Sequence, residues 1–211
     1  MKIPSFVRLW MLIGVFISQG LMAETIAEFT ASMEKRDGFV PIFYDGSTDK
    51  VYLQISQFDD AFIFQSSLPQ GVGSNDIGLD RGQLGETRLV EFERYGNKVM
   101  LKQLNTAYRA TSENTAERAS IDEAFADSVI AGLPIVAETD GVVLVDYTDF
   151  LLSDIHGIAV RLDRTKQGNF KADAKRSGVF LARTKAFPNN SELEALGCHC
   201  FVVVWLSRCC R

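Results

Sequence analysis

Short apolar segments separated by tight turns constrain this chain most, because they favour strands that pair with their neighbours in the sequence. The clearest pairs are residues 88–94 and 98–104 around Tyr95-Gly96-Asn97, and residues 135–138 and 142–145 around Thr139-Asp140-Gly141. Glycine, asparagine and aspartate suit tight hairpin turns, since they adopt left-handed backbone readily. Further strand-like segments lie at 39–44, 51–55 and 61–64. The sequence therefore predicts a mostly antiparallel β-sheet with hairpins.

Two segments depart from this pattern and predict amphipathic helices. From 116 to 133, an apolar residue recurs every fourth position, at Ile121, Phe125, Val129 and Leu133. From 149 to 162, a second apolar stripe occurs, with Thr148 or Asp149 placed to cap the helix. We expect both helices to pack on the sheet. The predicted fold class is α+β: mostly antiparallel β-sheet with hairpins and two amphipathic helices packed on it.

The first 23 residues have the features of a secretion signal. Lys2 and Arg8 precede and flank an apolar run at 9–17, and Ala23 offers a small residue at the cleavage point. An uncleaved membrane anchor is the alternative, but the run is shorter than the roughly 20 residues that span a bilayer. We expect a signal peptide at 1–23, a periplasmic or secreted protein, and no stable membrane insertion after cleavage.

All four cysteines fall near the C-terminal end, at Cys198, Cys200, Cys209 and Cys210. Their spacing, with His199 among them, matches no common zinc pattern, although a soft-metal cluster is an alternative. The segment differs in character from everything before it. We therefore expect a domain at 24–196, followed by an aberrant cysteine-rich tail at 197–211, a possible frameshift that the fold does not need.

The sequence shows no recognisable catalytic constellation. The net charge of −5 argues against a nucleic-acid ligand, which calls for a clustered basic surface. His156 stands without a second ligand at a metal-binding spacing, so a capping or partly exposed histidine is the preferred interpretation. We predict no catalytic residue, no cofactor-binding residue and no metal ligand in the chain.

A glycine-rich loop at 71–85 is the most distinctive feature of the sequence. Its glycines suggest left-handed backbone or close approach of other chain segments. Asn75, Asp76 and Asp80 could offer oxygens to a hard cation such as calcium, while Asp80 and Arg81 could instead form an ion pair that fixes the loop. A structural or docking loop carrying Asn75, Asp76, Asp80 and Arg81 is the preferred interpretation. Participation in a neighbouring active site is a further alternative.

At this loop a family resemblance becomes specific. Residues 73–85, GSNDIGLDRGQLG, resemble the N-terminal domain of unknown function found in exported bacterial zinc metallopeptidases of the Met-zincin group. Further matches follow in the same order along the chain, at 35–39 (KRDGF), 92–94 (FER), 108–109 (YR), 125–129 (FADSV), 146–152 (DYTDFLL) and 183–190 (RTKAFPNN). The resemblance extends over about residues 28–195.

The resemblance implies a non-catalytic domain that precedes a peptidase region carrying the His-Glu-x-x-His zinc ligands. Those ligands have no counterpart in this sequence, so the chain is expected to be truncated before the peptidase domain and inactive alone, with zinc held only by the peptidase domain of full-length relatives. That domain is the expected partner. The alternative is a free-standing cell-envelope binding module that uses the 71–85 loop.

Overall fold

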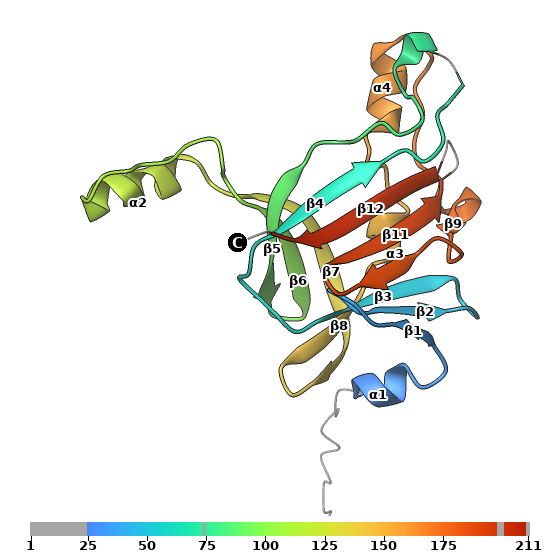
Figure 1. Cartoon of the computed structure of the whole chain (residues 1–211), viewed down its shortest axis with the longest axis horizontal. Helices are drawn as coiled ribbons and strands as arrows, with labels where there is room; N and C mark the ends of the chain where they lie inside the picture. The colour runs from blue at the N-terminus through green and yellow to red at the C-terminus, as the bar shows by residue number, and fades with distance from the viewer. Residues whose placement is uncertain (1–24, 74, 198–200, 210–211) are drawn as a thin grey trace, which may run out of the picture.

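The structure is a computed structural model that describes residues 25–73, 75–197 and 201–209, and it consists mainly of one curled sheet (Figure 1). The strands are β1 (Glu34–Arg36), β2 (Ile42–Asp45), β3 (Lys50–Ile55), β4 (Phe62–Ser67), β5 (Arg88–Tyr95), β6 (Lys98–Gln103), β7 (Ser128–Thr139), β8 (Val142–Asp146), β9 (Gly178–Val179), β10 (Lys185–Phe187), β11 (Asn190–Leu196) and β12 (Phe201–Arg208). The helical segments are α1 (Ile26–Phe29), α2 (Thr115–Ala124), α3 (Thr148–Leu151) and α4 (Ile158–Arg164), with 3-10 turns η1 (Asn75–Ile77) and η2 (Ala174–Arg176).

The sheet is antiparallel, and its strands follow the order β1-β2-β3-β8-β7-β6-β5-β4-β12-β11-β10, with β9 paired to β11. The long strand β7 pairs with β6 through its first part and with β8 through its last part, with register shifts in both pairings. Such irregularities bend a sheet, and here the sheet curls into a half-barrel. The predicted α+β class is therefore wrong: this is a sheet-dominated fold with a few short helices.

The two ends of the curled sheet meet at the segment that precedes β2. Ser191 Oγ, on β11, donates to Val40 O at 2.8 Å and accepts from Val40 N at 3.1 Å. Next to this contact, Phe39 N donates to Phe187 O at 2.7 Å. Helix α3 packs against both β3 and β11, inside the curl. The hydrophobic core fills the same concave side, with fully buried Tyr147 and Leu151 among the strand residues.

The predicted helix at 116–133 is correct only in its first part. Helix α2 ends at Ala124, and residues from Ser128 onward belong to β7. A spacing of four residues also keeps side chains on one face of a strand, so the recurrence did not discriminate between the two structures. Pro134 and the β-branched residues around Val129 favour the strand. Nor does α2 pack on the sheet: nearly all of its described side chains are exposed, and the helix lies away from the sheet in Figure 1.

The predicted helix at 149–162 is interrupted. Helix α3 ends at Leu151 and α4 begins at Ile158, and Gly157, the residue before α4, has a left-handed φ of 76° that a continuous helix does not allow. Asp154 caps α4, its carboxylate accepting from Ile158 N at 2.7 Å and from Ala159 N at 2.9 Å. Thr148, one of the two predicted caps, instead accepts from Val51 N at 3.0 Å and so ties α3 to β3.

Both predicted hairpins are confirmed, as β5–β6 and β7–β8.

The predicted signal peptide lies outside the described residues, as do Cys198, His199, Cys200 and Cys210 of the tail. Among the described helices, none has the length and apolar composition needed to cross a bilayer.

The C-terminal segment contributes an interior strand. Strand β12 lies between β4 and β11 and pairs with both along most of its length. Val202, Val204 and Leu206 are buried on one face of β12, and Val203 on the other. An aberrant origin for 197–211 stays a prediction, but the stability of this fold depends on residues 201–208.

We expect Leu206→Ala to destabilise the protein by about 2–5 kcal/mol, the range for truncating a buried leucine. Leu206 is fully buried and lies opposite Phe64 and Ser191 on the flanking strands. Urea unfolding measures the loss. The control Ser207→Ala should change the free energy of unfolding by no more than about 0.5 kcal/mol. Equal unfolding midpoints for Leu206→Ala and the parent chain would mean that β12 lies outside the fold.

Candidate functional site

The backbone of the 71–85 loop is fixed by hydrogen bonds at several points. Gly82 N donates to Leu68 O at 2.7 Å, and Leu68 N donates to Gln83 O at 3.0 Å. Closer to the tip of the loop, Val72 N donates to Leu79 O at 3.0 Å. The loop therefore folds back on itself as a continuation of β4 and presents its side chains in a defined arrangement.

Helix α4 holds the tip of this loop. Ile77 and Leu79 are buried with Ile158 and Leu162 of the helix, in a cluster that also includes Leu68 and Val202. Arg161 Nε donates to Ile77 O at 2.5 Å. Burial of these apolar side chains and the bond to a carbonyl explain why the helix and the loop form one unit.

The residues singled out in the loop do not converge on one point. Asp76, Asp80 and Arg81 are all exposed, and the side chain of Asn75 is not described. The structure shows no ion pair between Asp80 and Arg81, although both residues are described. Within the described ranges, no three acidic, histidine or cysteine side chains are grouped closely enough to hold a metal ion. The loop thus has a fixed backbone and an exposed charged edge.

His156 links the base of the loop to the turn between α3 and α4. Its Nδ1 lies 3.0 Å from Ser66 Oγ, on β4, and Gly85 N donates to Ser66 O at 2.7 Å. A Cβ on Gly85 would collide with Ser66 Oγ, so this close approach requires glycine. Burial lowers the pKa of His156, and the nearby Asp154 carboxylate opposes that shift. His156 is thus partly buried and hydrogen-bonded, and it contacts the loop.

A groove beside the loop was not anticipated from the sequence. It has a volume of about 340 Å³ and lies between Leu84 of the loop and Arg183. Its lining includes Glu194 and Trp205, which belong to adjacent strands β11 and β12. Burial raises the pKa of the Glu194 carboxyl, and Arg183 opposes the shift. The alternation of charged and apolar residues along β11 was the signal that could have pointed to this face.

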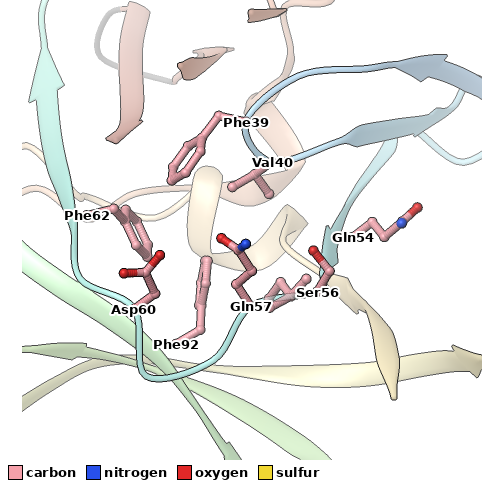
Figure 2. A pocket seen from close by; sticks show the side chains of 9 residues that line it. Phe39, Val40, Gln54, Ser56, Gln57, Asp60, Phe62 and Phe92 are labelled. Carbon is pink, nitrogen blue, oxygen red and sulfur yellow. The ribbon is translucent and has the colours of Figure 1, made fainter. Parts of the chain in front are cut away.

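A second cavity lies near the contact that closes the sheet. Figure 2 shows the rings of Phe39, Phe62 and Phe92 beside Gln57 and Asp60. Its volume of about 30 Å³ is too small for an organic ligand and matches the space of a water molecule.

We predict that Gly78→Ala destabilises the protein more than Gly73→Ala does. Both glycines have left-handed φ angles, 67° at Gly78 and 86° at Gly73, which cost an alanine about 1–2 kcal/mol. Only at Gly78 would the new Cβ also collide with Arg161 Nη2, while at Gly73 it would meet open space. Thermal unfolding compares the two variants. Equal losses would show that the close approach of Gly78 to Arg161 contributes nothing.

We also expect His156 to make the fold less stable as the pH falls. Its pKa in the folded state is below the ordinary value of 6.5. The unfolded chain therefore binds the proton first, and stability is lost between the ordinary pKa and the lower folded one. Between about pH 7.5 and 5.5, the melting temperature of the parent chain should fall further than that of His156→Gln. The same fall in both proteins would contradict the assignment.

Comparison with known proteins identifies one family. A family model described as a domain of unknown function (DUF5117) matches residues 82–198, from within the glycine-rich loop to the end of the β11 region. Searches of curated proteins and of solved structures find no match. The matched segment includes α2, α4 and the Glu194 side of the groove. Because the match covers more than half of the 211 residues, the chain belongs to the DUF5117 domain family.

Proposed function

We propose that this chain is the non-catalytic N-terminal domain of an exported zinc metallopeptidase-like protein, and that the 71–85 loop docks it onto the peptidase region. The resemblance of residues 73–85 and of the later motifs supports this proposal. On this view the chain is periplasmic or secreted, hydrolyses no peptide bond by itself and carries no cofactor. The zinc would be held by the His-Glu-x-x-His residues of the peptidase region.

The observation that carries the proposal is the combination of a fixed loop backbone with an exposed charged edge. The tip is held by α4 through Ile77 and Leu79, while Asp76, Asp80 and Arg81 remain exposed. A loop ordered before binding loses little conformational entropy when it meets a partner. Charges of both signs on such an edge favour one orientation of the partner over others.

A free-standing binding module of the cell envelope is the second candidate. The groove between Leu84 and Glu194 favours it, because the loop forms one wall of that groove. In this case the loop would contact a ligand in the groove, and no peptidase region would be needed.

The proposal predicts that the purified chain binds a separately produced zinc peptidase region of a Met-zincin relative, measured by titration calorimetry. Asp80→Ala and Arg81→Ala should each weaken binding by about fivefold, an amount typical of a charge at the edge of an interface. The control Asp37→Ala removes an exposed carboxylate whose salt-bridge partner is Lys35, on β1. That change should leave the affinity the same within about twofold.

Two results would contradict docking through the loop. One is the absence of binding at about 100 μM of each partner, which is far above the dissociation constants of specific protein complexes. The other is equal weakening by Asp37→Ala and by the two loop variants. Either result would leave the binding module as the surviving candidate.

A further inference from the structure

The groove beside the loop contains two buried polar atoms that lack hydrogen-bond partners among the described residues, one an acceptor and one a donor. It lies over β4, β12, β11 and β10, which run side by side in Figure 1. Val203 and Trp205 of β12 contribute to its lining, Leu84 lines it from the loop, Pro69 lines it from the segment after β4, and Glu194 lines it from β11.

The acceptor is Glu194 Oε1. Glu194 is only 2% exposed, and this oxygen has no hydrogen-bond partner among the described residues. The nearest cation, Arg183 Nη1, lies 3.7 Å away, beyond hydrogen-bond distance. The Arg183 side chain is itself about half exposed, so it covers the carboxylate without being fixed in the interior. A buried carboxylate oxygen without a donor is costly, and a ligand that supplies a donor would remove that cost.

The donor is Trp205 Nε1, which is also buried and without a partner in the described part of the chain. In the β11–β12 register, Glu194 lies opposite Val203 and Trp205 lies opposite Glu192. Trp205 and Glu194 are therefore diagonal neighbours on one face of the sheet. Both residues line the groove.

We propose that the groove binds an extended polypeptide segment through the N–H and C=O of one of its residues, which point to the same side of an extended chain. The peptide carbonyl accepts a hydrogen bond from Trp205 Nε1, and a peptide N–H donates to Glu194 Oε1 after the Arg183 side chain turns aside. An apolar side chain of the segment then packs against Leu84 and Val203. This inference goes beyond the docking role of the loop and does not depend on it.

The charges around the groove favour a neutral ligand over an ion. Arg183 and Lys185 line it together with Glu192 and Glu194, so positive and negative groups balance. A simple anion would meet the two carboxylates, and a simple cation would meet the two basic groups. A peptide backbone offers N–H donors and C=O acceptors without net charge, which complement Glu194 Oε1 and Trp205 Nε1.

The test uses the full chain carrying Trp10→Phe, because the sequence has two tryptophans and this change leaves Trp205 as the only one. The probe is the capped, uncharged tripeptide acetyl-Ala-Leu-Ala-amide. We expect a saturable shift of Trp205 emission to longer wavelength as Nε1 gains an acceptor. A second probe, the same peptide N-methylated at its internal amides, lacks the N–H donors and should bind at least tenfold more weakly.

Variants separate a binding role from a structural one. Glu194→Leu should weaken binding of the first probe at least tenfold without lowering the melting temperature, because an apolar group of similar size replaces a buried carboxylate whose Oε1 accepts no hydrogen bond from the described residues. The control Glu192→Gln lies on the same face, but its carboxylate already accepts from Asn190 Nδ2 at 3.0 Å. This control should keep the affinity within twofold. If Glu194→Leu fails to fold, Trp205→Phe, measured by calorimetry, should show the same loss of binding.

Three results would overturn the proposal: no saturable change in Trp205 emission, equal affinity for the two probes, or unchanged affinity in a folded Glu194→Leu or Trp205→Phe variant. A failure of the docking experiment with the peptidase region would leave the groove unaffected, since that experiment probes Asp80 and Arg81 instead.

Discussion

The fold depends on the contact that brings the two ends of the curled sheet together. Ser191 bonds both backbone groups of Val40, and Phe39 bonds Phe187 beside it. Without these bonds, the backbone just ahead of β2 and the edge of β10 would be separate. The contact also encloses the core, because α3 lies between β3 and β11 and fills the interior with Tyr147 and Leu151. The groove lies on the opposite face of β11 and β12 from this core, where Glu194, Val203 and Trp205 line it.

The sequence predicted those parts of the fold whose signals are local. At the β7–β8 turn, Asp140 and Gly141 have φ angles of 51° and 80°, which explains why this dipeptide indicates a hairpin. The helices were harder to predict. The spacing that links Val129 to Leu133 suits a helix and a strand alike, and pairing with β6 joins the local preference of Pro134 and the β-branched residues in selecting the strand. Gly157 interrupts the other helix, although a single glycine in an apolar pattern does not by itself end a helix.

The two candidate sites also differ in how local their sequence signals are. The glycine-rich loop is contiguous in the sequence, so its composition pointed to it directly. The groove brings together Pro69, Glu194 and Trp205, which are distant in the sequence and meet only through the order β4-β12-β11. No pattern within a short stretch of sequence indicates that these three strands are neighbours in the sheet. The unusual composition of residues 197–211 also directed the interpretation away from β12, although apolar β-branched residues such as Val202–Val204 are typical of interior strands.

The position of β12 has a consequence for the time at which this protein can fold. Strand β4 is made early, yet one of its two partners, β12, is the last described strand to leave the ribosome. Until then the edge of β4 has unpaired backbone groups, and the core lacks the layer that Val204 and Leu206 supply. Contacts between segments so distant in the chain form slowly. The described fold therefore cannot be completed before β12 has been synthesised, and until β12 inserts, β4 and β11 are not joined.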